Sequence, residues 1–233
     1  MTEDTSKLNT SKLGTKKYWD DFYTLEHSNF QSNPEDTGEN WFDDNDAELK
    51  MIQFLEEHLH EQPGLKSNAR VLDVGTGNGH LLFELREEEV FDEEAEFVGV
   101  DYSEVSVQFA KDIAVEKELD VRFEVLDLYD DNSGKDLGLF DVVLDKGTLD
   151  AIALSGLTFE EGTAVELYSS KVAKYMQAGS VLLITSCNFT EEELIGYITR
   201  EPTLEVWEKI QYGSFEFGGV KGQTICSVAF VKK

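Results

Sequence analysis

Three glycines at alternating positions follow a short apolar run that contains an acid. Residues 71–74 precede the turn at residues 75–79, and an amphipathic run at 81–85 comes next. Glycine at Gly75 and Gly77 allows positive φ and lets a ligand approach the backbone closely. Amide groups at the start of the following helix can then contact the polar groups of that ligand. This order predicts a strand, a tight turn and a helix that together bind a nucleotide-like ligand.

The spacing of the glycines indicates which ligand binds, although such a turn can also be purely structural. A dinucleotide-binding turn reads G-x-G-x-x-G, whereas here the third glycine comes one residue early and His80 takes the expected place. A short-chain oxidoreductase would also need Tyr-x-x-x-Lys. The sequence has no such pair, since Tyr168 and Lys171 are one residue too close. The pattern argues against a dinucleotide.

Carboxylates also end the next strand-like runs. Asp101 follows residues 97–100 and stands 22 positions after Gly79, and a carboxylate about 20 residues past a glycine turn can accept from both ribose hydroxyls. The run at 121–125 leads to Asp127, and the run at 140–144 leads to Asp145. Asp127 is either a ligand contact or a turn residue. Asp145 is either a site residue or a cap for the turn that follows it.

The elements that must position these acids alternate between strands and helices. The expected strands are 71–74, 97–100, 121–125, 140–144, 181–184, 204–210 and 223–231, with a hairpin-like connection at 215–219. The expected helices are 47–59 (with Leu49, Ile52, Leu55 and Leu59 inward), one capped by Ser103, one carrying Leu167, Val172 and Met176, and one begun by the capping box of Thr190 and Glu193. This alternation predicts a doubly wound α/β sheet whose ligand crevice lies at the carboxyl edge.

The N-terminal part differs in character. Residues 1–13 are polar and expected to be disordered, and residues 14–233 are expected to form one domain with a helical and aromatic extension at 14–60. The aromatic run from Tyr18 to Tyr23 predicts a short helix lying on the domain. Trp41 and Phe42 either staple the extension to the core or wall a pocket.

Composition limits the classes of function. The chain has 233 residues, of which 40% are hydrophobic and 29% charged, as in one globular domain. No apolar run approaches the ~18 residues of a membrane span, and the N-terminus does not resemble a secretory signal. Cys187 and Cys226 are expected to be buried free thiols in a reducing compartment. His58 and His60 point to different helix faces, so no metal site is expected.

The charge is strongly one-sided. With 48 acids against 20 bases, the net charge is −28, which argues against nucleic acid as substrate because phosphate binding needs a basic surface. A basic protein partner would be attracted by this field. Alternatively, many of the acids only keep the chain soluble.

Residues 40–233 resemble the seven-stranded class I methyltransferases that use S-adenosylmethionine. They look most like the eukaryotic lysine methyltransferases that modify translation elongation factor 1-alpha. The matching segments are 36–42, the glycine turn, 144–152, 183–188 and 215–219. An acidic insertion at 87–96 departs from the family pattern and affects only that loop.

The resemblance implies a mostly parallel sheet of order 3-2-1-4-5-7-6 with the last strand antiparallel, and methyl transfer to a lysine side chain. The implied cofactor-binding residues are Trp41, Asp73, Gly75, Thr76, Gly77, Asn78, Gly79, Asp101, Tyr102, Asp127, Leu128 and Asp145. The implied substrate-binding residues are Phe42, Lys146, Thr148, Phe215 and Phe217. A monomeric, cytoplasmic protein is expected, with nuclear presence also open. A small-molecule methyltransferase and a methyltransferase-like binding module are the alternatives.

Asp145 is the expected catalytic residue. S-Adenosylmethionine already carries a good leaving group, so an enzyme must mainly align a neutral amine behind the methyl. A carboxylate there can contact the lysine or the cofactor's amino group and favours positive charge nearby. It also opposes deprotonation of the lysine, so Asp145 alone cannot supply the base.

Overall fold

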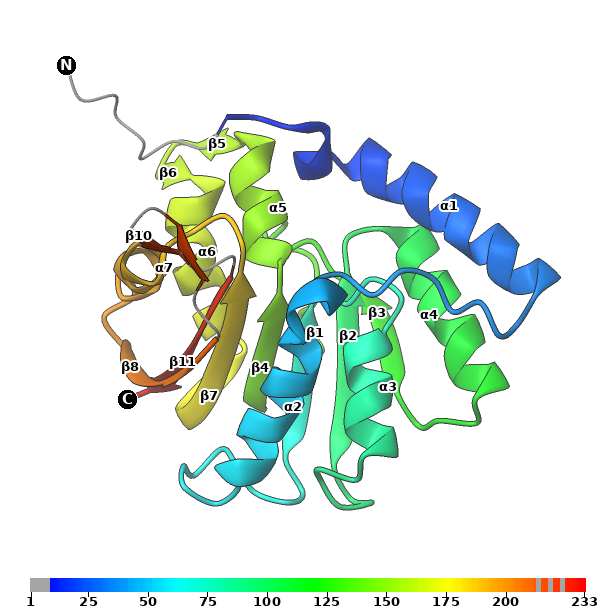
Figure 1. Ribbon diagram of the computed structural model, residues 1–233, viewed down its shortest axis with the longest axis horizontal. Helices are drawn as coiled ribbons and strands as arrows, with labels where there is room; N and C mark the ends of the chain where they lie inside the picture. The colour runs from blue at the N-terminus through cyan, green and yellow to red at the C-terminus, as the bar shows by residue number, and fades with distance from the viewer. Residues whose placement is uncertain (1–8, 213–214, 218–219, 223–224) are drawn as a thin grey trace.

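The computed structural model describes residues 9–212, 215–217, 220–222 and 225–233. One seven-stranded sheet organises the chain (Figure 1). Its strands are β1 (Arg70–Val74), β2 (Glu96–Asp101), β3 (Arg122–Val125), β4 (Phe140–Lys146), β7 (Met176–Ser186), β8 (Leu204–Ile210) and β11 (Cys226–Lys232). The sheet order is β3-β2-β1-β4-β7-β11-β8. Counted along the chain, this is the predicted order 3-2-1-4-5-7-6, and β11 runs antiparallel to both neighbours as expected.

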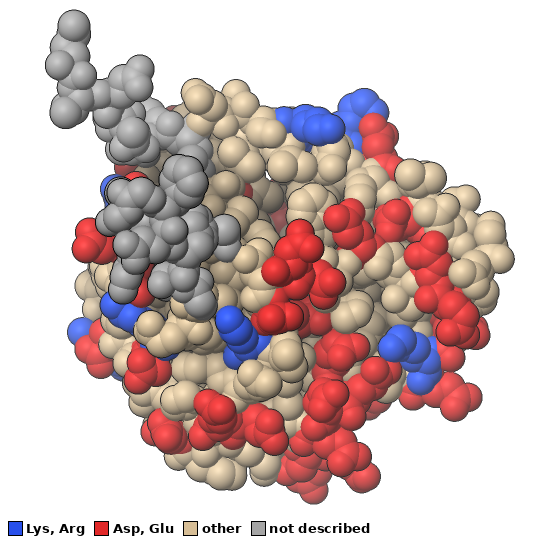
Figure 2. Space-filling view, in the orientation of Figure 1, with Lys and Arg blue, Asp and Glu red and all other residues tan. Residues whose placement is uncertain are grey.

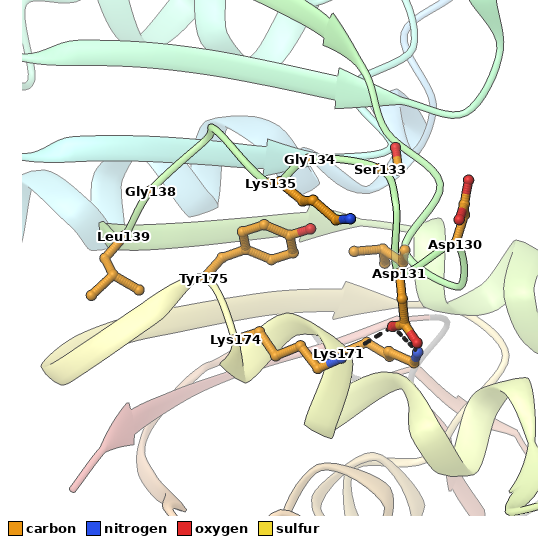
Figure 3. A pocket seen from close by; sticks show the side chains of 11 residues that line it. Asp130, Asp131, Ser133, Gly134, Lys135, Gly138, Leu139, Lys171, Lys174 and Tyr175 are labelled. Carbon is orange, nitrogen blue, oxygen red and sulfur yellow. Dashed lines mark hydrogen bonds and ion pairs between the residues drawn. The ribbon is translucent and has the colours of Figure 1, made fainter.

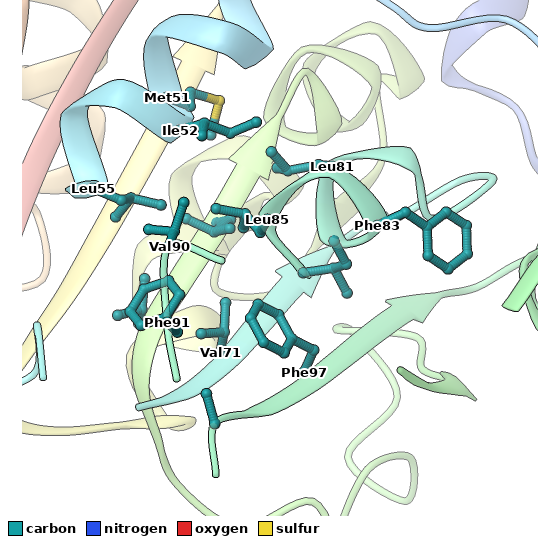
Figure 4. Close-up of a cluster of buried hydrophobic side chains, with 14 of the residues drawn as sticks. Met51, Ile52, Leu55, Val71, Leu81, Phe83, Leu85, Val90, Phe91 and Phe97 are labelled. Atoms are coloured by element: carbon teal, nitrogen blue, oxygen red, sulfur yellow. The ribbon is translucent and has the colours of Figure 1, made fainter. Parts of the chain in front are cut away.

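Helices cover both faces of the sheet, so two apolar cores form. One face carries α2 (Ala47–Glu57), α3 (His80–Glu87) and α4 (Glu104–Glu116), with α1 (Lys16–Ser32) outside α4. The other carries α5 (Thr148–Ser155), α6 (Ala164–Ala173) and α7 (Glu191–Ile198). Successive strand residues face opposite sides, so Val71 packs under α2 and α3 (Figure 4) whereas Leu72 joins the other core.

The smaller elements connect these layers. They are the 3-10 turns η1 (Lys12–Gly14) and η2 (Asp43–Asn45), the hairpin of β5 (Thr158–Phe159) and β6 (Gly162–Thr163), and the hairpin of β9 (Phe215–Phe217) and β10 (Val220–Gly222). The last of these lies where a hairpin-like connection was predicted. No helix in the described ranges is long and apolar enough to cross a membrane.

Local sequence signals account for several helix ends. Ser103 caps α4 by accepting from the Ser106 amide, and Thr190 with Glu193 forms the predicted capping box of α7. Three expectations were wrong. Leu49 is 53% exposed because α2 turns Met51 and Phe54 inward instead. Met176 starts β7 rather than ending α6, and Cys187 is exposed rather than buried, because β7 ends one residue before it. Helix α5 was not predicted, because its short run is apolar nearly all round.

The N-terminal extension runs along the end of the sheet at which the arrowheads of β4 and β7 point (Figure 1). The predicted helix at residues 18–23 is part of the longer α1. Before it, the Ser11 backbone amide donates to the Leu154 carbonyl of α5 (3.0 Å), so residues that were expected to be disordered contact the domain. A Cβ placed on Gly14 would lie 2.3 Å from the Leu154 carbonyl carbon, so the segment before α1 packs closely on α5.

Candidate functional site

The glycine turn is bound to the end of β2. The Gly75 and Thr76 amides donate to the Val100 carbonyl (2.7 and 2.9 Å), and the Gly77 amide donates to Asp101 Oδ2 (3.1 Å). The φ angles of Gly75 and Gly77 are 69° and 58°, a region that favours glycine. The structure therefore brings the turn and the strand-end acid together at the carboxyl edge.

The Asp101 carboxylate is oriented by two backbone amides. Besides Gly77, the Ser103 amide donates to its Oδ1 (2.9 Å), and the side chain is buried. Burial raises the pKa of Asp101. Asp127, by contrast, is exposed and accepts from the Tyr129 amide (2.9 Å), as a turn residue does. Contact of either acid with ribose or adenine stays a prediction.

Asp73 is a buried carboxylate on β1. It is 3% exposed and forms no ion pair within the described residues. Burial raises the pKa of Asp73 to about 7, although the Thr76 side chain and the Lys146 charge lower it; repulsion from Glu48 and Asp101 adds to the rise. An ammonium group bound beside Asp73 would relieve both effects.

Aromatic side chains of the extension cover the glycine turn. A Cβ placed on Gly77 would lie 2.3 Å from Tyr23 Oη, so the packing of α1 on this turn requires glycine at position 77. The Trp41 ring lies 5.2 Å from Trp19 and 6.0 Å from Phe22, centroid to centroid. Trp41 thus packs on α1 inside the extension, and whether it staples the extension to the core stays a prediction. Whether it also walls a ligand pocket stays a prediction. Tyr23 was not predicted, because an aromatic helix face usually indicates core packing.

Two polar side chains, those of Asn78 and Lys146, fix the segment at residues 37–41. Asn78 Nδ2 donates to the Thr37 carbonyl (3.0 Å). The Lys146 ammonium donates to Asn40 Oδ1 (2.6 Å) and to the Trp41 carbonyl (3.0 Å). Of the predicted site residues, Asn78 and Lys146 therefore contact the family-like segment at 36–42 directly.

The Lys146 ammonium also pairs with a buried acid that sequence reasoning missed. Glu48 Oε2 lies 2.9 Å away, and Glu48 Oε1 lies 2.6 Å from His80 Nδ1. Glu48 is 5% exposed. A signal was present, because Glu48 lies four residues before Ile52 on the apolar face of α2, where an acid needs a buried partner.

Asp145 is enclosed by donors. Its side chain is 0% exposed, Oδ1 accepts from the Thr148 amide (2.8 Å), and Oδ2 accepts from the Leu149 amide (3.0 Å) and the Tyr168 hydroxyl (2.5 Å). Burial raises its pKa to about 8. These contacts cap α5, and a catalytic role for Asp145 stays a prediction. Tyr168, on α6, was not predicted as its partner.

The other predicted substrate residues lie beside the end of β4. A Cβ on Gly147 would lie 2.7 Å from the Phe42 ring, so the ring packs directly on this turn. Phe42 has φ 70°, which is unusual for a bulky residue and is typical of functional or strained positions. The Thr148 hydroxyl donates to the Val74 carbonyl (2.7 Å) and joins β4 to β1. The Phe215 and Phe217 side chains lie outside the described part.

A separate cavity of about 310 Å³ lies between the loop at residues 128–139 and the end of α6 (Figure 3). The ammonium groups of Lys171 and Lys174 both contact Asp131 at its rim, at 3.1 and 3.3 Å. Among the predicted cofactor residues only Leu128 lines it. The cavity is therefore separate from the residues of the glycine turn.

Comparisons with known proteins identify the family of the chain. A family model described as a methyltransferase domain matches residues 65–222. Protein-lysine N-methyltransferase EFM4 of Saccharomyces cerevisiae is 47% identical over 234 residues, covering 99% of each chain. The efm4 protein of Schizosaccharomyces pombe is 41% identical over 97% of this chain and 96% of its own. EEF1A lysine methyltransferase 2 of Homo sapiens is 32% identical, over 95% of this chain and 87% of its own.

Solved structures support the fold at lower identity. A TehB-like SAM-dependent methyltransferase from Corynebacterium glutamicum is 17% identical with a TM-score of 0.57, covering 92% of this chain and 98% of that one. Magnesium protoporphyrin IX methyltransferase from Synechocystis, solved with bound SAM, is 20% identical with a TM-score of 0.54, covering 91% and 97%. The family model and the near full-length relatives show that the chain belongs to the methyltransferase-domain family, among the protein-lysine N-methyltransferases.

Proposed function

We propose that the protein transfers a methyl group from S-adenosylmethionine to a lysine side chain of translation elongation factor 1-alpha. The observation that carries the proposal is the near full-length match to relatives named protein-lysine N-methyltransferase and EEF1A lysine methyltransferase 2. The glycine turn and strand-end acids at the carboxyl edge are consistent with it. A basic protein substrate also suits a chain of net charge −28.

The residues of the crevice fit the cofactor. Asp73 is buried, forms no ion pair among the described residues, and suits the α-amino group of the cofactor. Asp101 already holds the Gly77 amide and suits a ribose hydroxyl. The cofactor supplies an electrophilic methyl group on sulfonium. The chain's own contribution is to bind and orient it and to bring an amine into line.

The lysine amine must be neutral when it attacks. A raised pKa of about 8 leaves Asp145 largely uncharged near neutral pH, so this residue opposes deprotonation less than an ordinary carboxylate would. The nearby Lys146 ammonium favours a neutral amine, although Glu48 offsets part of its charge. Phe42, packed on Gly147, is proposed to line the path of the substrate side chain.

The acidic surface supports a basic protein as partner. Acidic side chains gather over α1 and α3 in the view of Figure 2, and few basic ones lie among them. The same charge disfavours nucleic acid as a substrate. We also propose that the protein acts as a monomer, does not bind membranes and works in the cytoplasm, with nuclear presence open. A small-molecule methyltransferase or a non-catalytic binding module is not favoured by any single feature of the crevice.

Labelled-methyl transfer tests the proposal. Purified protein and labelled S-adenosylmethionine are added to a lysate of cells that lack the enzyme. We expect one labelled band at the size of elongation factor 1-alpha, with the label on lysine in peptide mass spectra. Label only in small molecules would identify the alternative enzyme class, and binding without transfer would identify a binding module.

A further inference from the structure

One buried carboxylate holds the loop that follows β7. Asp150, in the first turn of α5, is 4% exposed. Its Oδ2 accepts from the Cys187 amide (2.9 Å), and its Oδ1 accepts from the Asn188 amide (3.3 Å) and the Ser186 hydroxyl (2.5 Å). The Ser186 oxygen in turn accepts from the Phe189 amide (3.2 Å). Three consecutive backbone N–H groups therefore converge on the Asp150–Ser186 pair.

The geometry of the peptide bond then fixes where the carbonyl groups point. In a trans peptide, the N–H of one residue and the C=O of the residue before it point in opposite directions. The described residues contain no cis peptide bond. The carbonyl oxygens of Cys187 and Asn188 therefore face away from Asp150, and within the described part of the chain no hydrogen bond reaches either of them. The loop thus presents two adjacent acceptors.

The loop with these acceptors lies at the same edge of the sheet as Lys146, one of the predicted substrate residues. Lys146 at the end of β4 pairs in register with Thr185, and the Gly147 amide donates to the Thr185 carbonyl (3.0 Å). The loop begins two residues later, at the same edge of the sheet. Cys187 is exposed and Asn188 is half-buried, so a ligand can reach both.

Resting on the proposed function, we propose that the Cys187 and Asn188 carbonyl oxygens receive the amine of the substrate lysine. Asp150 is then the positioning residue that aims them. A neutral primary amine has two N–H donors and one lone pair. When two fixed acceptors take the two donors, the lone pair has one remaining direction, which is what in-line attack on a methyl group needs. The specificity is for a long primary amine, not for a hydroxyl or a thiol.

An Asp150→Asn variant changes the orientation of the loop's peptide groups and keeps the size of the side chain at position 150. The carboxamide has one acceptor oxygen where the carboxylate has two, and its NH2 group faces backbone donors. The Cys187 or Asn188 amide must then find another partner, and its peptide group turns. Asp141→Asn is the matched control, because Asp141 is also buried and accepts from a backbone amide, that of Arg70 (2.9 Å), but at the opposite end of β4.

Steady-state kinetics separates positioning from general stability. We expect Asp150→Asn to raise the KM for the protein substrate at least tenfold, with the Kd for S-adenosylmethionine within threefold of wild type. Asp141→Asn should leave both constants unchanged, even where its unfolding temperature falls as far. An unchanged KM in Asp150→Asn, or a KM that rises equally in both variants, would overturn the inference.

A second measurement keeps this result distinct from the identity of the substrate. N-acetyl-lysine methylamide is titrated into the protein saturated with S-adenosylhomocysteine, and the amide resonances of residues 187–189 are followed by NMR. We expect saturable shifts in wild type that Asp150→Asn loses. Shifts without transfer to elongation factor 1-alpha would refute the proposed function and keep the inference, whereas transfer without shifts would do the reverse.

Discussion

The Lys146 ammonium lies 2.9 Å from the Glu48 carboxylate, and this ion pair joins the end of β4 to the first turn of α2. Both side chains are largely buried, at 12% and 7% exposure. The same ammonium binds Asn40 and the Trp41 carbonyl. One lysine therefore connects the N-terminal extension to the strand end that faces the proposed substrate, so packing of the extension and shape of the crevice depend on each other.

Removing this connection should loosen the extension. Lys146→Met keeps most of the apolar stem but leaves Glu48 buried without its cation, a change that costs about 3 kcal/mol of unfolding free energy in comparable buried pairs. We expect faster amide hydrogen exchange across residues 37–46 and weaker cofactor binding. Hydrogen-exchange mass spectrometry and calorimetric titration measure these effects.

Lys66→Met is a suitable control, because Lys66 pairs with Asp141 at the other end of β4 and its side chain is 45% exposed. It should leave exchange at residues 37–46 unchanged. Unaltered exchange in Lys146→Met as well would show that contacts other than those of Lys146, such as the Asn78 hydrogen bond to Thr37, hold this segment.

Much of this fold could be predicted from local patterns, whereas the contacts between distant segments could not. Apolar runs that end in acids located the strands, and the glycine turn located the crevice, because both depend on neighbouring residues. Tyr23 over Gly77 and Tyr168 on Asp145 bring together residues 54 and 23 positions apart. Such pairings depend on how α1 and α6 pack on the sheet. The spacing of residues within one segment does not determine that packing.

The acid at the end of β2 can be tested by charge removal. Asp101→Asn keeps the shape of the side chain and weakens its hydrogen bonds to the Gly77 amide and to a ribose hydroxyl. Hydrogen bonds to a charged group contribute about 1.5–3 kcal/mol, so affinity for S-adenosylmethionine should fall roughly ten- to a hundredfold. Calorimetric titration of the folded variant measures it, and unchanged affinity would remove Asp101 from the cofactor site.

The pKa of Asp73 predicts how cofactor binding depends on pH. The carboxyl group must ionise to pair with an ammonium group, and its raised pKa is about 7. Affinity should therefore increase about fivefold from pH 6 to pH 7, a range in which an α-amino group stays protonated. Titrations at several pH values give the profile. In Asp73→Asn the profile should be flat, and an equally steep profile in that variant would assign the proton to another group.

Asp145→Asn tests the predicted catalytic residue. The carboxamide places an NH2 group among the Thr148, Leu149 and Tyr168 donors, so the turn after β4 should distort. We expect turnover to fall at least a hundredfold while cofactor affinity falls only modestly. Single-turnover methyl transfer and calorimetry separate the two. A fully active variant would limit Asp145 to capping α5.

The same variant should change how stability depends on pH. Burial raises the pKa of Asp145 to about 8 in the folded protein, against about 3.9 in an unfolded chain. Between these two pKa values the folded protein binds one proton more than the unfolded chain. The wild type therefore loses stability as the pH rises from about 4 to 8. Asp145→Asn lacks this loss, so its free energy of unfolding relative to wild type should improve between pH 5 and pH 8. Denaturant titrations at each pH check the sign.

The net charge of −28 predicts that salt slows the encounter with a basic substrate. Exposed charges attract at long range and are largely screened between about 0.05 and 0.3 M salt. Catalytic efficiency, kcat/KM, should therefore fall across this range. Turnover at saturating substrate should change much less, since the reacting groups are aligned within the crevice. Initial rates over a salt series with purified elongation factor 1-alpha give both constants.

Replacing surface acids should reproduce the effect of salt. Glu93 and Glu94 are exposed and lie in the acidic insertion at 87–96, away from the glycine turn in the sequence. The double variant Glu93→Gln, Glu94→Gln should lower kcat/KM at low salt and differ little from wild type at high salt, where both fields are screened. A short lysine peptide of low charge serves as control, because it gains little from steering. An efficiency that is flat in salt for the protein substrate would leave the acidic surface with solubility as its role.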